Sequence, residues 1–166
     1  MCARSDVLEP VEYTGGYTMA DRHGPMRTGR FQVEFDGLEV AGWREVSIPA
    51  SRTEMGEYDE GGDPDQRKKV WGETTFEDLE MERGVQPSDT RVYDWREDIR
   101  NGNLDDGLKE VSVILQDEEG QAQLRWEFHD AWIKYYDPPD LEAGADGEVA
   151  VERITLGFDS MDRVEE

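Results

Sequence analysis

Residues 31–47 read FQVEFDGLEVAGWREVS, and this stretch decides the fold class. The apolar residues at its start alternate with polar ones, which is the period of a half-buried strand. These apolar residues are Phe31, Val33 and Phe35. Asp36-Gly37 predicts a tight hairpin, because glycine accepts the positive φ that a two-residue turn requires. We expect the return strand to cover residues 38–48, with a kink near Gly42.

The same alternation recurs along the rest of the chain. It predicts strands over residues 74–83, 111–115, 121–129 and 132–136. The turn at 117–120 makes the second and third of these a hairpin. Phe76 is out of phase with the apolar residues that follow it, which indicates a bulge. In the last strand, 149–158, the apolar phase changes near Glu152, which predicts a bulge or burial on both faces.

Residues 90–101 are predicted to form the one clear helix. Its apolar stripe consists of Val92, Trp95 and Ile99. Ser88 or Asp89 is suited to cap its start by accepting backbone N–H bonds. Gly102 is suited to follow its end, because glycine adopts the left-handed conformation common there.

Two segments show no lasting period. Residues 49–72 are polar and are predicted to form a long loop that is functional or mobile, since loops of this length are uncommon. Residues 1–29 are predicted to form an extended N-terminal arm, with a disordered tail as the alternative. The domain organisation expected is this arm followed by one β domain over residues 30–163.

The composition is strongly acidic, with 41 Asp and Glu, 18 Lys and Arg, and a formal net charge of −23. Such a chain does not bind nucleic acid or an anionic membrane through a general basic surface, because phosphate affinity comes from Lys and Arg. No apolar run suits membrane insertion and no secretory signal is visible, so cytoplasmic assembly is expected. Scarce lysine favours a halophilic source, where salt screens self-repulsion. An acidic mesophilic protein is the alternative.

No catalytic site, metal site or cofactor is predicted. Cys2, His23 and His129 have no metal-motif spacing between them, and the glycine pairs open no phosphate-binding loop. A glycosidase-like pair of carboxylates across a cleft stays open as an alternative, because 41 acidic residues form close pairs by chance.

The order of the segments resembles the tail-tube proteins of contractile-tailed phages and contractile injection systems. Residues 31–47 have the family's aromatic-rich strand, Asp-Gly turn and Glu-Val-Ser ending. Similar segments follow in the family's order at residues 58–62, 79–85, 93–102, 111–120, 125–132, 139–141 and 148–152. The family's Lys-x-x-Gly segment appears here as Lys69-Val-Trp-Gly72, with a bulky Trp71.

The resemblance implies a mainly β fold, an antiparallel barrel or sandwich with one flanking helix. It implies hexameric rings that stack into a tube conducting DNA or an effector protein. The implied partners are a contractile sheath and baseplate, spike and tube-terminator proteins. The role would be structural, not enzymatic. The alternatives are a type VI secretion ring protein and a small ligand-binding or carbohydrate-active β-barrel.

The resemblance also assigns roles to residues. The loop that reaches toward the adjacent ring would comprise Glu57, Tyr58, Asp59, Glu60, Gly61, Gly62 and Asp63. The sheath-facing side of the helix would carry Arg91, Asp94, Glu97 and Asp98. The predicted core comprises Phe31, Val33, Phe35, Trp95, Ile99, Trp126 and Phe128. Trp43 and Trp71 flank the polar segment and are candidates for an interface, because tryptophan often anchors protein contacts.

Overall fold

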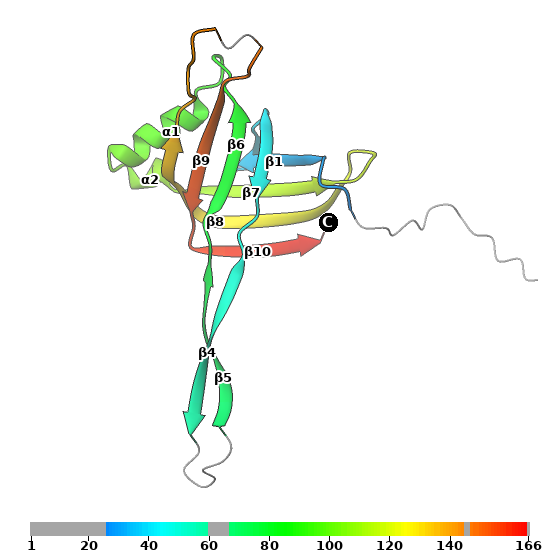
Figure 1. The fold of residues 1–166 in the computed structure, drawn as a ribbon, viewed down its shortest axis with the longest axis vertical. Coiled ribbons are helices and arrows are strands. Elements are labelled where there is room, and N and C mark those ends of the chain that lie inside the picture. The colour runs from blue at the N-terminus through cyan, green and yellow to red at the C-terminus, as the bar shows by residue number, and fades with distance from the viewer. Residues whose placement is uncertain (1–25, 60–66, 145–146, 166) are drawn as a thin grey trace, which may run out of the picture.

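The structure is a computed structural model that describes residues 26–59, 67–144 and 147–165. Antiparallel strands dominate it, with one main helix at their side and a long hairpin projecting from the body (Figure 1). The prediction of a mainly β, antiparallel fold with one flanking helix is confirmed. Most of the predicted arm, residues 1–29, lies outside the described residues.

One part of the main sheet has the strand order β2-β1-β7-β8-β10. These strands are β1 (Phe31–Phe35), β2 (Leu38–Glu39), β7 (Lys109–Gln116), β8 (Ala122–Asp137) and β10 (Ser160–Glu165). The predicted turn at Asp36-Gly37 joins β1 to β2, and both residues have positive φ, 51° and 76°. These angles suit a two-residue hairpin, so the first strand pair forms as the sequence predicts.

The second part has the order β8-β9-β6-β3, with β9 (Val151–Gly157), β6 (Leu79–Gly84) and β3 (Trp43–Ser47). The first half of β8 pairs with β7 and β10, whereas its last residues pair with β9. Asp130, between the two halves, has a positive φ of 51°. Strand β8 therefore passes from one part to the other, and the two sets of strands cross (Figure 1).

The core lies between these two parts and beneath α1 (Arg91–Arg100). Its buried members include Val33, Phe35, Leu79, Met81, Val92, Trp95, Val111, Val113, Phe128, Ile133, Ile154 and Leu156. Phe31, Ile99 and Trp126 are partly buried and pack against this cluster. The short helix α2 (Leu104–Gly107), which the sequence did not predict, follows α1.

The C-terminal end of α1 forms as expected, but its N-cap residue is neither of the predicted residues, Ser88 and Asp89. Thr90 is its N-cap residue, and the neighbouring Asp89 accepts a backbone hydrogen bond from Arg91 N at 3.2 Å. At the other end Gly102 has a φ of 75° and its N–H donates to the Ile99 carbonyl at 3.1 Å. The indole N–H of Trp95 donates to the Gly107 carbonyl at 2.8 Å, which fixes α1 against α2.

The prediction of one return strand over residues 38–48 is wrong. Strand β2 ends at Glu39, and β3 pairs with β6 rather than with β1. Gly42 has a φ of 93° and redirects the chain between them. Alternation of side chains predicts a strand, but it does not say which strand becomes its neighbour.

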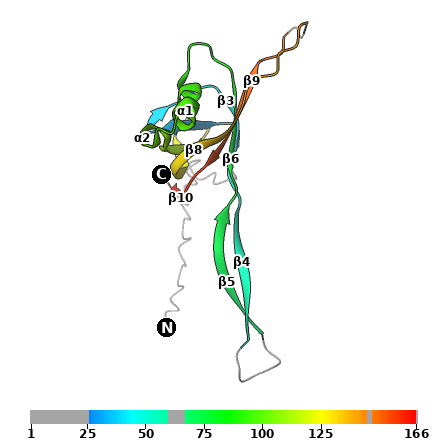
Figure 2. The same ribbon diagram turned by 90° about the vertical axis from the view of Figure 1, so that its left-hand side faces the viewer.

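The prediction of a loop over residues 49–72 is also wrong. Strands β4 (Ser51–Asp59) and β5 (Arg67–Phe76) form a separate two-stranded antiparallel sheet. The predicted strand over residues 74–83 is correspondingly two strands, because β5 ends at Phe76 and β6 begins at Leu79. The hairpin extends away from the body (Figures 1 and 2), so neither of its faces carries the apolar alternation of a core strand.

The predicted bulge near Glu152 is absent from the pairing of β9 with β6, whose register is continuous from Leu156 to Val151. Glu152 itself occupies an inward position and is 5% exposed. The apolar phase changes because a buried ionic residue stands where an apolar residue was expected. Strand β10 was not predicted either, since most of its residues are exposed.

Candidate functional site: assembly surfaces

The projecting hairpin is the most exposed regular element of the described chain. Residues 51–57 and 69–76 are exposed on both faces of the two-stranded ribbon. Its strands are joined by backbone pairing, by a hydrogen bond between the Thr53 and Thr74 hydroxyls at 2.8 Å, and at its base by Glu77 N and the Ala50 carbonyl at 3.0 Å. Little side-chain burial supports this element within one subunit.

Large apolar side chains lie on this hairpin. Met55 and Trp71 are directly opposite each other in the register and are 62% and 88% exposed. Val70, the preceding residue of β5, is also exposed and lies on the other face of the ribbon. Exposed apolar patches of this kind mark surfaces that contact another molecule.

The two tryptophans predicted as interface candidates differ. Trp43 packs edge-on against Phe35, with ring centroids 5.9 Å apart, and the Arg83 guanidinium lies 5.5 Å from its ring centroid. Trp43 is therefore part of the edge of the body. Trp71 has no comparable packing within the described residues and remains the candidate.

The predicted inter-ring loop falls on the far half of the hairpin. Glu57, Tyr58 and Asp59 belong to β4. Glu60, Gly61, Gly62 and Asp63 lie outside the described residues. Three of the seven residues predicted to form a loop therefore lie in a strand.

Of the residues predicted to face a sheath, Arg91 is tied to its own subunit. Its guanidinium Nε donates to Asp89 Oδ1 at 2.8 Å, and another of its nitrogens donates to the Glu39 carbonyl at 3.0 Å. The hydrogen bonds from Arg91 hold the pKa of Asp89 well below its usual range. This cluster joins the start of α1 to β2.

The other three residues of that set lie on two sides of α1. Asp94 accepts a hydrogen bond from the Thr90 hydroxyl at 2.8 Å and, with Asp98, borders a hollow of about 250 Å³ next to Leu38. Glu97 forms an ion pair with Arg100 at 3.1 Å. The exposed side of the helix therefore carries charges of both signs.

Sequence reasoning missed a buried ionic network between β6, β9 and β8. Arg83, which is 2% exposed, donates from Nε to Glu152, and another of its nitrogens lies 3.2 Å from Asp89 Oδ2. Tyr136 donates to the second Glu152 oxygen at 2.8 Å. Burial, together with this carboxylate, raises the pKa of Tyr136 to about 12. The glutamate in the apolar phase of the last strand was the signal that could have revealed this network.

His129 holds a second ionic cluster together. Its Nδ1 lies 2.6 Å from Glu110 Oε2 on β7, and its Nε2 lies 3.1 Å from Asp162 Oδ2 on β10. The hydrogen bond to Glu110 is the main cause that raises the pKa of His129. The cluster links three neighbouring strands near the bend of β8.

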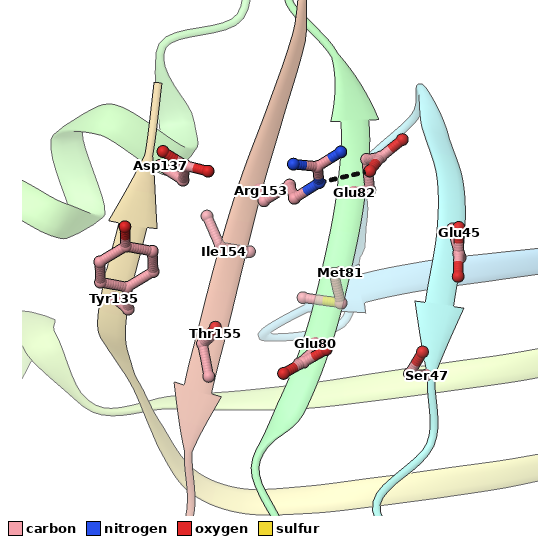
Figure 3. A pocket seen from close by; sticks show the side chains of 10 residues that line it. All are labelled: Glu45, Ser47, Glu80, Met81, Glu82, Tyr135, Asp137, Arg153, Ile154 and Thr155. Atoms are coloured by element: carbon pink, nitrogen blue, oxygen red, sulfur yellow. Dashed lines mark hydrogen bonds and ion pairs between the residues drawn. The ribbon is translucent and has the colours of Figure 1, made fainter. Parts of the chain in front are cut away.

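The open face of β3, β6, β9 and β8 is acidic. A shallow hollow of about 270 Å³ lies there, lined by four carboxylates on β3, β6 and β8 (Figure 3). These are Glu45, Glu80, Glu82 and Asp137. Arg153 donates to Glu82 Oε2 at 2.6 Å and is the cation lining the hollow. Among the described residues no group of acidic, His or Cys side chains could hold a metal ion.

Comparison with known families identifies the family of the chain. The model of the family described as T4-like virus tail tube protein gp19 matches residues 27–162. The chain belongs to this tail-tube family. Comparison with the sequences of curated proteins finds no match. Tail-tube proteins are structural, so the tail-tube role excludes the ligand-binding and carbohydrate-active alternatives.

Solved structures show the same fold. The tube-terminating cap of the anti-feeding prophage is 23% identical, with a TM-score of 0.75 over 86% of this chain and 93% of that one. The sheath-tube complex of an extracellular contractile injection system, PVC, matches at 22% identity and a TM-score of 0.74, covering 87% and 95%. The Hcp1 protein from Flavobacterium johnsoniae is less similar, at 13% identity and a TM-score of 0.51, covering 82% and 95%.

The tail-tube protein is thus a component of a contractile tail, and the type VI alternative is the weaker one. None of the helices in the described part of the chain is long and apolar enough to cross a bilayer.

Proposed function

We propose that six copies of this tail-tube protein form a ring, and that rings stack into the inner tube of a contractile injection system or phage tail. The observation that carries the proposal is the projecting hairpin, whose two faces are exposed in one subunit. An exposed ribbon with open edges is unfavourable in isolation and suited to pairing with another chain. Similar proteins occur in assemblies described as sheath-tube and baseplate complexes.

The free edges of the body support closure into a ring. Within the described residues β3 pairs only with β6, and β10 pairs only with β8. Each therefore has one side available to a neighbouring subunit. Closing a ring of identical subunits covers such edges, which otherwise invite uncontrolled pairing.

We assign the acidic face of Figure 3 to the channel. Its carboxylates would repel DNA or an acidic effector protein and so reduce adhesion during transit. The exposed side of α1, with Asp94, Glu97 and Asp98, would face a contractile sheath. Baseplate, spike and tube-terminator proteins would contact the ends of the tube.

Electron cryomicroscopy of the purified chain across a salt series tests the proposal. A charge of −23 per subunit must be screened before copies assemble, so rings and tubes are expected in molar salt and monomers at low salt. We also propose that the source is halophilic, because a halophilic source predicts this salt dependence. Assembly that strengthens as salt is removed would contradict the halophilic source. A monomer at every concentration and salt would contradict the tube.

A shortened hairpin tests the role of its far half. Gly56 and Val70 are directly paired, so replacing Glu57–Lys69 with Asn-Gly closes the ribbon by a two-residue turn. Rings should still form, because the body is unchanged, but stacking of rings should be lost. An unchanged unfolding midpoint is the control for the fold. Normal tubes from this variant would show that the far half of the hairpin does not join the rings.

A further inference from the structure

Trp71 is 88% exposed in its own subunit. It lies on β5 in the projecting hairpin, opposite the exposed Met55, and points to solvent from an element with little side-chain burial. A tryptophan this exposed is an unusual surface residue and suits an anchor for a contact between proteins.

A third hollow, of about 380 Å³, lies where the hairpin joins the body. Three aromatic residues line it: Phe76, Trp132 and Phe158. The rings of Phe76 and Phe158 are 5.9 Å apart, and the Trp132 ring lies over Gly157, where any Cβ would clash with it. The hollow therefore has aromatic side chains in its lining and is of a size that accepts another aromatic side chain.

Trp71 cannot fill the hollow of its own subunit. It precedes Phe76 in the same extended strand, by about 16 Å at roughly 3.3 Å per residue. The hairpin is continuous through this stretch and paired with β4 from Ser51 to Asp59. The residue that fits the hollow must come from another molecule.

The charges around the two surfaces are complementary. Trp71 follows the basic run Arg67-Lys68-Lys69 along the strand, and Lys69 is exposed. At the hollow, Lys134 is paired with Asp78 at 2.7 Å, so Glu77 and Asp159 leave the rim acidic. Strand β5, which carries Lys69 near Trp71, is therefore complementary in charge to this rim.

We propose that Trp71 of one copy packs into the aromatic hollow of a second copy, with Lys69 next to the acidic rim. Trp71 and the hollow lie at different places on one chain. The contact is therefore heterologous, and each copy can bind a further copy in the same way. This inference goes beyond the proposed function, because it names a pairwise contact that can form with or without a complete tube.

Cross-linking between two singly modified chains tests the contact. In a Cys2→Ser background, Lys69→Cys in one isotope-labelled preparation is mixed with Glu77→Cys in an unlabelled one and treated with a short bismaleimide. The control mixes Lys69→Cys with Glu142→Cys. Glu142 is exposed and belongs to the connection between β8 and β9, which lies at the end of the body opposite the hairpin (Figure 1). The Glu77 mixture should yield at least ten-fold more mixed dimer. Equal yields from the two mixtures would overturn the proposal.

Removing the Trp71 side chain gives the matched test. Adding Trp71→Ala to the Lys69→Cys chain should lower the mixed-dimer yield at least ten-fold, and Trp71→Phe should restore part of the yield. Leu141→Ala, at another exposed apolar residue, should leave the yield unchanged. Undiminished cross-linking by Trp71→Ala would also overturn the contact. Tubes that form normally with Trp71→Ala would leave the proposed function standing without this contact. Mixed dimers in a chain that never forms rings would leave the contact standing without the proposed function.

Discussion

The body and the projecting hairpin are both antiparallel β structure, yet they place their apolar side chains differently. In the body, Val33, Phe128 and Leu156 are buried against one another. In the hairpin, Met55 and Trp71 face solvent. One subunit therefore completes its own core but leaves part of its apolar surface exposed, and this is the surface that the proposed assembly would cover.

The largest effect is expected when a tryptophan is replaced by alanine in each of the two regions. Trp95 is 1% exposed, packs against Phe35 and donates a buried hydrogen bond. Trp95→Ala should lower the free energy of unfolding by about 3–5 kcal/mol. Trp71→Ala should change it by less than about 0.5 kcal/mol, because Trp71 is 88% exposed and the residue opposite it, Met55, is also exposed.

Urea unfolding of both variants, at a concentration where the chain is monomeric, measures these values. A large loss of stability from Trp71→Ala would mean that the hairpin folds onto its own body. A small loss from Trp95→Ala would place the core elsewhere than beneath α1.

A second pair of variants compares glycines. A Cβ at Gly157 would lie 2.7 Å from the Trp132 ring, whereas a Cβ at Gly56 would lie 3.4 Å from Val70 Cγ2. Gly157→Ala should therefore cost about 1–3 kcal/mol by displacing the ring, as overpacking does in cores. Gly56→Ala should stay within about 0.5 kcal/mol of the wild type. Thermal unfolding measures both, and equal costs would contradict the difference in packing.

Sequence reasoning succeeded where the pattern and the burial belong to the same chain. The turn at Asp36-Gly37 needs only local backbone geometry. The stripe of Val92 and Trp95 needs only the period of a helix packed on a core. Both were predicted because each residue type answers a local physical requirement.

The failures have two physical causes. The hairpin was read as a loop because strands exposed on both faces carry no alternation, whatever their backbone pairing. Glu152 was read as a change of phase because its compensating partner, Arg83, lies far away in sequence. Pairing between two exposed strands leaves no local signal in the chain. A long-range ionic pair leaves only a charge in an apolar position, which does not identify its partner.

The smallest effect concerns the pH dependence of the body. The pKa of His129 is raised in the folded state by Glu110 on β7 and Asp162 on β10. The stabilisation is therefore complete below the unfolded pKa of about 6.5 and is lost as pH rises through the higher folded value. Its size should be under about 1 kcal/mol, because solvent screens this half-exposed cluster. Urea unfolding between pH 6 and pH 9 should show a decline in stability that His129→Gln lacks. Trp71→Ala is the hairpin control and should retain the decline, since the cluster belongs to the body. Parallel curves for the wild type and His129→Gln would show that the histidine does not stabilise the attachment of β10.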